Sequence, residues 1–461
     1  MTGTWVALHT FGCKLNQAET EALGERLEEH GFRIVPAAEQ ADVYVVNTCT
    51  VTHVADRKVR HWLRLARRRS PDAYLVATGC YVERIPEELT GLADLVVDNE
   101  EKCRIPDLLQ GLLAHQAGHA RGHSYGLCGP GSTRNGAGRV RSLVKIQAGC
   151  AGACSYCVVP KVRPGELSVP LDTVLREVRR RAALGYREVV LTGTKVGRYR
   201  SNGEGLRELV TRILAETDVE RVRLSSLQPG EITSGLVELW QDGRLCRHFH
   251  LSLQSGSDVV LRNMRRGYTA NEYLRALELI RQAVPEAAVT SDLIVGFPRE
   301  SEEDFEQSLS VCREAGFAGV NVFPYSARPG TEAAQMGGQV DEKVKKVRVQ
   351  KALELGMQSR QRFNEGFLGS VAPVLWEKEV RPGSGVYSGL TDTYIRVFTQ
   401  SSAPLTNRVT QTRLVRAGEQ HIWGEALNED LGSGEARIEG RGARLGGRRS
   451  DGKDQGSGPG R

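Results

Sequence analysis

Cys150-Ala-Gly-Ala-Cys154-Ser-Tyr-Cys157 is the stretch of this chain that constrains its fold and chemistry most. Its three cysteines are separated by three and then by two residues. Iron–sulfur clusters are held by cysteine thiolates, normally one for each iron of a four-iron cluster. Three thiolates therefore leave the fourth iron of such a cluster open to another molecule. A zinc site is the alternative, but zinc sites usually pair two C-x-x-C units or add histidines, and neither is near this stretch.

The segment around this stretch, residues 139–369, has the pattern of repeated βα units. Apolar runs of strand length lie at 143–147, 188–192, 221–225, 248–253, 289–295 and 319–323. Segments with helical periodicity lie between them, most clearly at 171–184 and 302–315. Six such units predict a partial (βα)6 barrel, although the pattern alone is also compatible with a flat doubly wound sheet. The Cys150 stretch follows the first strand, so it is expected at the C-terminal edge of the strands, where such barrels carry their chemistry.

An N-terminal segment, residues 1–113, alternates strand and helix patterns in the same way and predicts a separate βαβ domain. Its predicted strands lie at 5–8, 43–46, 74–77 and 94–97. Cys13, Cys49 and Cys80 each stand just past the end of one of the first three strands. Ligands bind at this edge of open α/β sheets, so we expect the three thiols to converge there. An inert buried thiol is the ordinary alternative for any one of them.

Three further segments differ in composition. Residues 114–138 are rich in Gly, His, Arg and Ser without an apolar period, which predicts a mobile linker. Residues 370–428 contain short β-rich runs at 371–376, 394–399 and 408–415, which predict a small antiparallel OB-like β-barrel. Residues 429–461 have almost no large apolar side chains and predict a disordered tail. The expected fold class is therefore α/β, with a small C-terminal β-barrel.

Length and composition fit a multidomain enzyme, since the chain has 461 residues and a 40% apolar fraction. The N-terminus lacks the features of a signal peptide and no apolar run reaches about 18 residues, so we expect a cytoplasmic protein without a membrane partner. Ten cysteines then indicate ligands and buried thiols rather than disulfides. Those outside the two sets above have no site-like context: Cys103, Cys128, Cys246 and Cys312. The net charge of +6 permits a nucleic-acid partner without arguing for one.

The cysteine spacing, with Tyr156 just before the last cysteine, resembles that of radical S-adenosylmethionine (SAM) enzymes. In that superfamily the open iron chelates SAM, and reduction cleaves SAM to a 5′-deoxyadenosyl radical. The architecture to about residue 428 resembles the methylthiotransferase family of these enzymes, with an N-terminal three-cysteine domain, a radical SAM core and a TRAM domain. The resemblance implies two [4Fe-4S] clusters. It assigns the SAM-binding cluster to Cys150, Cys154 and Cys157, and an auxiliary cluster that carries the donated sulfur to Cys13, Cys49 and Cys80.

Within that family, Thr10-Phe-Gly-Cys-Lys-Leu-Asn16 and Asn47-Thr-Cys-Thr-Val-Thr-His-Val-Ala-Asp-Arg-Lys58 are most similar to the branch that acts on N6-threonylcarbamoyladenosine beside the tRNA anticodon. We therefore expect a tRNA methylthiotransferase that makes the 2-methylthio form of this nucleoside. Its expected partners are the anticodon loop of tRNA and a reductant such as flavodoxin or ferredoxin, with the immediate sulfur donor left open. Alternatives of the same class act on isopentenyladenosine in tRNA or on a ribosomal-protein aspartate. A nonenzymatic RNA-binding iron–sulfur protein is the alternative of another class.

The resemblance also implies contacts to SAM at the strand ends, by Tyr156, Gly193, Gln254 and Gly296. Simple packing is the alternative for Tyr156, and turn geometry is the alternative for the glycine-containing loops. Two positions depart from the family pattern. Pro164-Gly165 interrupts the Arg-Gly-Arg run that usually follows the cluster, and Arg299 replaces the usual glycine after Gly296-Phe-Pro.

A predicted helix after Cys49 carries a run of arginines. Arg57, Arg60, Arg64 and Arg68 share one helical face by their spacing. That face is expected either to contact tRNA phosphates or to be a solvated charged surface. The TRAM-like segment has six basic and seven acidic residues from 370 to 430, so RNA binding there rests on resemblance alone.

Overall fold

The computed structural model describes residues 3–116 and 140–427. The predicted tail and nearly all of the predicted linker lie outside them. Helix α5 (Ile105–Gln116) runs slightly past residue 113, where we expected the first domain to end. No helix in the described ranges is long and apolar enough to cross a membrane.

The N-terminal domain is a five-stranded parallel sheet with the order β2-β1-β3-β4-β5. Its strands are β1 (Trp5–Thr10), β2 (Arg33–Val35), β3 (Val43–Thr48), β4 (Tyr74–Gly79) and β5 (Leu95–Val97). Helices α1 (Lys14–Glu29) and α5 pack on one face of the sheet, and α2 (His53–Arg69), α3 (Cys80–Arg84) and α4 (Glu87–Thr90) pack on the other.

Strand β3 shows why this sheet needs a continuous apolar run. All of its residues are buried, because the strand is covered on both faces. Val43 and Val45 pack with the side chains of α1 and α5, whereas Tyr44 and Val46 pack with those of α2. Successive side chains of a strand point to opposite faces, so a strand between two helical layers has no polar side. The prediction of a βα domain here is confirmed.

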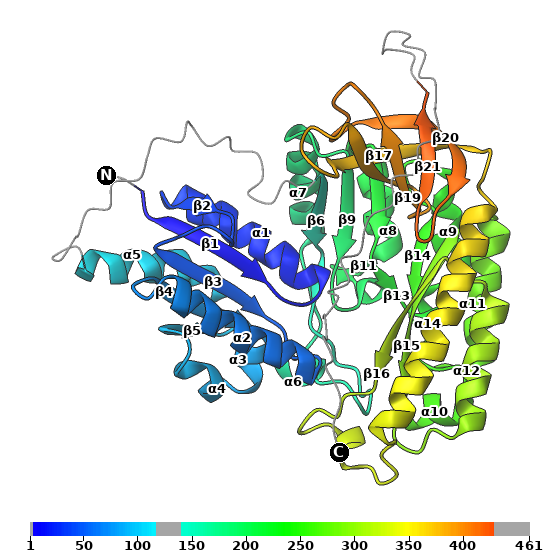
Figure 1. Cartoon of the computed structure of the whole chain (residues 1–461), viewed down its shortest axis with the longest axis horizontal. Coiled ribbons are helices and arrows are strands. Elements are labelled where there is room, and N and C mark those ends of the chain that lie inside the picture. Colours follow the sequence, from blue (N-terminus) through cyan, green and yellow to red (C-terminus); the bar gives the residue numbers. More distant parts are fainter. Residues whose placement is uncertain (1–2, 117–139, 428–461) are drawn as a thin grey trace, which may run out of the picture. The chain divides into compact units, whose positions relative to one another are not determined.

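The central part of the chain is a curved sheet of parallel strands with helices on its outer face (Figure 1). The strands are β6 (Arg141–Lys145), β9 (Glu188–Thr192), β12 (Arg221–Leu224), β13 (Ser226–Leu227), β14 (His248–Leu251), β15 (Ala288–Val295) and β16 (Gly319–Pro324). Hydrogen bonds join β12-β9-β6 and β13-β14-β15-β16, and a bridge between Val222 and Leu245 links the two groups. The predicted partial barrel is therefore confirmed.

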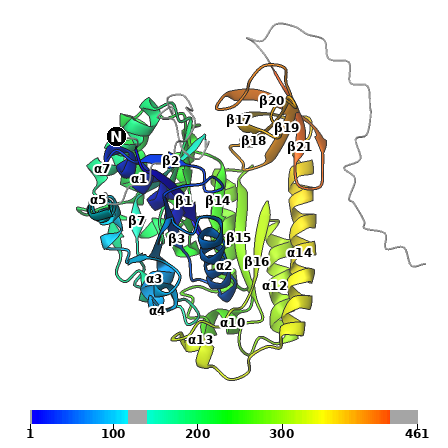
Figure 2. The ribbon, with the colours of Figure 1, turned by 60° about the vertical axis from the view of Figure 1, so that its left-hand side comes forward.

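The main helices of this core cover the barrel from outside. They are α7 (Leu171–Ala183), α8 (Leu206–Glu216), α11 (Ala270–Ala283), α12 (Glu302–Ala315) and α14 (Glu342–Glu365). Ser301 caps the start of α12, because its hydroxyl accepts from Asp304 N–H while the Asp304 carboxylate accepts from Ser301 N–H. Gly316, with φ +53°, caps its end. Helix α14 packs along β16, as Figure 2 shows.

The remaining elements are short. They are η1 (Glu101–Arg104), β7 (Gln147–Ala148), α6 (Val159–Val162), β8 (Leu167–Ser168), η3 (Val196–Arg198), β10 (Arg200–Ser201), β11 (Glu204–Gly205), η4 (Pro229–Glu231), α9 (Ser234–Val237), η5 (Glu238–Gln241), α10 (Asp258–Asn263) and α13 (Glu332–Gln335). Between β12 and β14, only α9 and the 3-10 turns η4 and η5 replace a long helix.

The C-terminal part closes into a five-stranded barrel with the order β17-β18-β19-β21-β20. Its strands are β17 (Val371–Glu379), β18 (Val386–Thr391), β19 (Arg396–Gln400), β20 (Val409–Ala417) and β21 (Ile422–Ala426). The fully buried Trp376 fills its interior and donates its indole N–H to Thr410 Oγ1 at 2.8 Å. The predicted small barrel is confirmed, and β18 and β21 are strands that the sequence pattern did not reveal.

Candidate functional site

The Cys150 stretch forms a loop beyond β6 and β7, and the loop brings its three thiols together. Gly149 allows the approach, because its φ is +80° and a Cβ there would lie 2.4 Å from the Gly165 carbonyl oxygen. Gly152 N–H donates to Cys150 Sγ at 3.2 Å, and Arg266 Nη1 donates to Cys154 Sγ at 3.4 Å. Burial raises the pKa of Cys157 to about 11, and the thiolates of Cys154 and Cys150 add to the rise. Thiolates that repel one another in this way are stabilised by a cationic partner such as iron.

Cys13, Cys49 and Cys80 converge at the C-terminal edge of the N-terminal sheet. Gly12, with φ +103°, lets the chain pass so close that a Cβ there would lie 3.0 Å from Cys49 Sγ. Burial, with a smaller contribution from the Cys80 and Cys13 thiolates, raises the pKa of Cys49 to about 12. Cys49 and Cys80 are buried and Cys13 is exposed. Each of the three thiols follows the end of a parallel strand of this sheet: β1, β3 or β4.

Neither set of thiols is arranged around one point. In residues 3–116 and 140–427, no three His, Cys, Asp or Glu side chains are placed to hold a metal ion. A four-iron cluster binds each of its cysteines to a different iron, so its thiolates need not meet at a single atom. In both sets the potential ligands are cysteine thiols, and a glycine (Gly149 or Gly12) lets the backbone pass close by, which fits such a cluster.

Arg163 links the two cysteine sets and was missed by our sequence analysis. Its Nε donates to Cys80 Sγ at 3.2 Å, and its Nη2 donates to Asn16 Oδ1 at 3.0 Å. Both Nη atoms also bind the Glu19 carboxylate, at 2.8 and 2.7 Å. Arg163 directly precedes Pro164-Gly165, so the region that departs from the family pattern contacts the N-terminal domain.

Glu19 supplies the carboxylate that Arg163 binds across the interface between the N-terminal domain and the core. Besides Arg163, it pairs with Lys102 Nζ at 2.7 Å and Lys145 Nζ at 3.0 Å. Burial raises the pKa of Glu19, but the hydrogen bond from Arg163 and the charges of all three cations lower it well below its usual range. A second contact between the domains joins Asp56 to Arg328, with Oδ2 and Nη2 2.6 Å apart.

The residues expected to contact SAM lie at the same edge of the barrel as Cys150. Gly193 follows β9, and a Cβ there would lie 2.8 Å from the Gln147 carbonyl oxygen. Gln254 has φ +67° and bridges to Leu293 of β15. Gly296 follows β15, and its N–H donates to Glu300 Oε2 at 2.6 Å. Tyr156 packs edge-on against Phe297, with ring centroids 6.4 Å apart.

Arg299 has a backbone conformation that favours glycine. Its φ is +67°, in the left-handed region that glycine enters without strain. Arg299 N–H donates to the Gly338 carbonyl oxygen at 2.7 Å, and this bond holds the turn. The loop shape at this departure is therefore that expected for glycine, at a cost of about 1 kcal/mol.

A cavity of about 580 Å³ extends through the barrel from the cysteine edge to the C-terminal barrel. We name it the central cavity. Its walls come from the N-terminal domain (Cys13, Lys14), from the core strands (Gly193, Ser225, His248, His250, Thr290, Asp292, Asn321), from α14 (Arg360) and from the C-terminal barrel (Leu390, Tyr394, Arg396), among others. One cysteine expected to hold the auxiliary cluster, Cys13, and one residue expected to contact SAM, Gly193, thus line the same cavity.

The arginines of α2 form the predicted helical face, with one correction. Arg57, Arg64 and Arg68 are exposed and have no ion pair among the described residues. Arg60 instead pairs with Glu88 Oε2 at 2.8 Å and donates to the hydroxyl of Tyr81. The i, i+3 and i+4 spacing correctly predicted that these arginines share one face of α2. It could not show that Glu88 of α4 pairs with Arg60.

Residues 144–312 match the radical SAM superfamily, and residues 5–98 match a family described as uncharacterized protein family UPF0004. A relative named threonylcarbamoyladenosine tRNA methylthiotransferase MtaB, from Bacillus subtilis, is 33% identical over 91% of this chain and 96% of its own. The protein of the same name from Aquifex aeolicus is 36% identical over 85% and 96%. A tRNA-2-methylthio-N(6)-dimethylallyladenosine synthase from Syntrophotalea carbinolica is 33% identical over 91% and 99%.

Solved structures share the fold at much lower identity. The radical SAM methyltransferase TsrM from Kitasatospora setae, solved with cobalamin and a [4Fe-4S] cluster, has a TM-score of 0.53 and 15% identity. The match covers 84% of this chain and 81% of that one. At this identity the likeness concerns the fold alone.

Proposed function

The chain belongs to the methylthiotransferase family of radical SAM enzymes, and we propose that it converts N6-threonylcarbamoyladenosine beside the tRNA anticodon to its 2-methylthio derivative. The family uses SAM and [4Fe-4S] clusters, and methylthiotransferases carry two of the latter. The observation that carries the choice of acceptor is the pair of motifs around Cys13 and Cys49. The 33% and 36% identity, over most of the chain, to relatives named for this nucleoside supports the same choice, although the relative named for dimethylallyladenosine is also 33% identical.

We assign one cluster to each set of thiols: Cys150, Cys154 and Cys157 for the SAM-binding cluster, and Cys13, Cys49 and Cys80 for the auxiliary one. When bound, the first supplies radical formation from SAM and the second supplies sulfur. Hydrogen bonds from Gly152 and Arg266 stabilise thiolates of the first set, and one from Arg163 stabilises Cys80. Such donors orient the ligands and adjust the electron density of the sulfurs.

The central cavity is where these residues position the acceptor. Cys13 and Gly193 both line it, so a base held there lies within reach of both proposed cofactor sites. Walls from all three parts of the protein shield the base from water. An unstacked anticodon-loop base can enter such a pocket without the opening of a duplex. We propose flavodoxin or ferredoxin as the reductant and the cytoplasm as the compartment.

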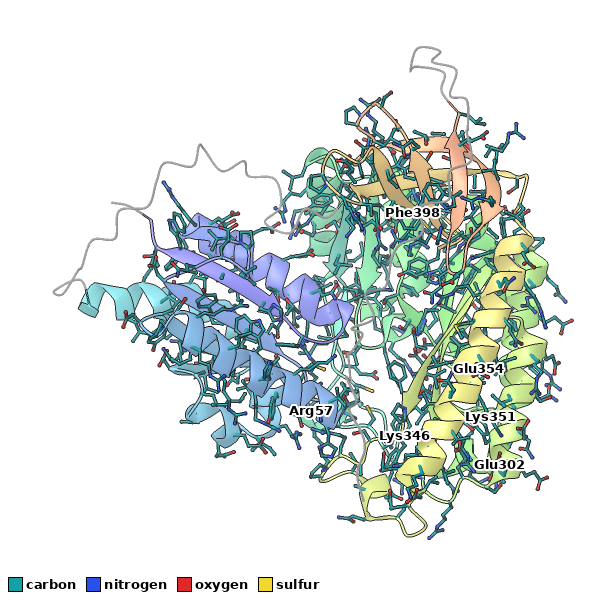
Figure 3. The ribbon with its side chains drawn as sticks, in the orientation of Figure 1. Arg57, Glu302, Lys346, Lys351, Glu354 and Phe398 are labelled. Carbon is teal, nitrogen blue, oxygen red and sulfur yellow. The ribbon has the colours of Figure 1, made fainter. Side chains whose placement is uncertain are left out.

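Neutralising Arg57, Arg64 and Arg68 to Gln is expected to weaken tRNA binding and to flatten its salt dependence. The three guanidinium groups are exposed on α2, where Arg57 is labelled in Figure 3. Removing one cation that neutralises a phosphate lowers the slope of log K against log salt by about 0.7 to 0.9. Binding is measured by fluorescence anisotropy at several salt concentrations.

The matched control replaces Arg207, Arg275 and Arg313, which are exposed on α8, α11 and α12. It has the same change in net charge and should keep the wild-type slope. An equally flattened slope in both variants would show that only the net charge matters and that α2 is a solvated face.

Liquid chromatography and mass spectrometry of RNA nucleosides test the acceptor directly. The reconstituted enzyme is expected to methylthiolate tRNA that carries threonylcarbamoyladenosine and to leave tRNA with plain adenosine at that position unmodified. A site built to bind the threonylcarbamoyl group leaves polar groups unpaired when that group is missing, which costs a factor of about 10⁴ or more. Cells with and without the gene should differ in the same nucleoside.

Activity on isopentenyladenosine tRNA or on a ribosomal protein, with none on threonylcarbamoylated tRNA, would overturn the acceptor and keep the enzyme class. Absence of 5′-deoxyadenosine after reduction in the presence of SAM would instead indicate an RNA-binding protein without this enzymatic activity.

A further inference from the structure

The central cavity carries an excess of positive charge. Asp292, the carboxylate that lines it, is already engaged by His250 Nε2 at 3.2 Å and Asn321 Nδ2 at 3.0 Å. Arg396 pairs with Glu377. Arg360 has no ion pair among the described residues, but its Nε donates to the Ala318 carbonyl oxygen at 3.4 Å. Lys14 is different, because within residues 3–116 and 140–427 its ammonium group has neither an ion pair nor a hydrogen bond. A partly buried cation without a counter-ion is a ready site for an anionic ligand.

The surroundings of Lys14 reinforce this charge. The charged or titratable groups that act on Lys14 include Tyr394, Arg223, Arg141 and Glu188, which belong to the core and to the C-terminal barrel. The charge of Lys14 also acts on Asp292. Burial raises the pKa of Tyr394, but the charges of Lys14, Arg141 and Arg223 outweigh burial and lower it. The His248 ring stacks on Tyr394 at 4.3 Å and supplies a flat wall. An anion at this end of the cavity would therefore meet a positive potential.

Glu188 is not free to neutralise Lys14. It is fully buried and pairs with Arg223 Nε at 2.8 Å and Arg221 Nη2 at 2.9 Å, with Arg141 Nη1 3.9 Å away. Burial raises its pKa, yet these three arginines hold it at about 2. Arg141 pairs more closely with Glu377 Oε1, at 2.7 Å, and Arg396 also pairs with Glu377. Four arginines therefore share the two carboxylates of Glu188 and Glu377, and the region keeps a net positive charge before Lys14 is counted.

We propose that Lys14 binds the terminal carboxylate of the threonylcarbamoyl group and thereby selects an anionic modified adenosine over one with an apolar side chain. This inference rests on the proposed function. The threonylcarbamoyl group ends in the carboxylate of threonine, whereas an isopentenyl group is a neutral hydrocarbon. A hydrocarbon would cover the Lys14 ammonium without pairing with it, so the same residue that attracts one substrate disfavours the other.

The position of Lys14 also suits the reaction. It is the first residue of α1 and directly follows Cys13, which occupies the N-cap position of that helix without a side-chain capping bond. In adenine, C2 and C6 are separated only by N1, so the atom that receives sulfur lies on the same edge as the N6 substituent. Lys14 is next to Cys13. If it holds the end of the N6 substituent, the edge of the base that carries C2 faces the side of the cavity that Cys13 lines.

The test compares two anticodon stem-loop RNAs that differ at one group. One carries threonylcarbamoyladenosine, and the other carries its threoninamide analogue, in which a neutral carboxamide replaces the carboxylate. Binding to the reconstituted holoenzyme is measured by fluorescence anisotropy. Phosphate contacts are common to both RNAs and cancel in the ratio of dissociation constants. The wild-type protein is expected to prefer the carboxylate about tenfold to a hundredfold.

Three variants assign the preference to Lys14. Lys14→Met should bring the ratio close to one while leaving the affinity for the carboxamide RNA unchanged, and Lys14→Arg should restore most of the preference. Lys346→Met is the matched control, because Lys346 is exposed on α14 (Figure 3) and can affect only contacts common to both RNAs. The iron content of every variant is measured, since Lys14 adjoins Cys13.

Equal binding of the two RNAs by the wild-type protein would overturn the inference without any variant. An equal loss of affinity for both RNAs in Lys14→Met would also overturn it and would assign Lys14 a structural role. These outcomes are distinct from failure of the proposed function. If the enzyme methylthiolates threonylcarbamoyladenosine RNA and its carboxamide analogue equally well, only the proposed role of Lys14 is refuted. If it modifies isopentenyladenosine RNA alone, the proposed acceptor is refuted.

Discussion

Replacing Cys150, Cys154 and Cys157 together with Ala is expected to reduce 5′-deoxyadenosine formation from SAM to background. These thiols are brought together by one loop at the C-terminal edge of the barrel, and the proposed cluster has them as its only protein ligands. Without the cluster there is no iron to chelate SAM and no route for the electron that cleaves it. The product is measured by liquid chromatography after anaerobic reconstitution and reduction.

The N-terminal domain should keep its own iron in this variant. Its three thiols come from another domain, and the hydrogen bond from Arg163 to Cys80 does not involve the side chains of the Cys150 loop. Cys103→Ala is the matched control, because Cys103 is an exposed thiol outside both sets. Persistent reductive formation of 5′-deoxyadenosine in the triple variant would show that SAM is cleaved elsewhere.

Strand positions could be predicted because each is a short-range property of the chain. Residues 188–192 were expected to form a strand from their apolar run, and β9 has these bounds. The strand-end position of Cys13, Cys49 and Cys80 followed from the same patterns, since parallel strands end at one edge of their sheet. These residues are distant in sequence, and their strand-end position was predictable only because parallel strands end at the same edge of their sheet.

Contacts between domains could not be predicted in this way. Arg163 and Glu19 are 144 residues apart, and neither stands in a pattern that relates it to the other. Arg60 does not join the exposed basic face as expected, because Glu88 of α4 approaches it in space. Lys14 belongs to the motif at residues 10–16, yet its unpaired charge is visible only when the core and the C-terminal barrel surround it.

The two unexpected strands of the C-terminal barrel have a local explanation. In β18 (Val386–Thr391), Ser388 and Gly389 interrupt the apolar run, and β21 (Ile422–Ala426) contains Gly424. Both glycines are required by packing, because a Cβ at Gly389 would lie 2.6 Å from Val374 Cγ1 and one at Gly424 would lie 2.6 Å from Thr412 Cγ2. Glycine weakens the strand signal at the places where closure of a small barrel needs it most.

Replacing Cys13, Cys49 and Cys80 together with Ala is expected to abolish methylthiolation while SAM cleavage continues. These residues are the proposed ligands of the sulfur-bearing cluster, and they belong to a different domain from the Cys150 loop. About half of the reconstituted iron should be lost, as expected when one of two cysteine-ligated clusters is missing. Iron is measured by colorimetric assay, and modified nucleosides and 5′-deoxyadenosine are measured by mass spectrometry.

This variant tests the site rather than the fold, because the main contacts around it do not depend on sulfur. Arg163 no longer meets the thiolate of Cys80 but keeps Glu19 and Asn16, and Glu19 keeps Lys102 and Lys145. The domains should therefore remain joined, and the melting temperature of the metal-free protein should stay close to that of the metal-free wild type. Unchanged iron content with a normal melting temperature would mean that the three thiols are structural. Loss of SAM cleavage together with methylthiolation would mean that the two sites cannot be separated as proposed.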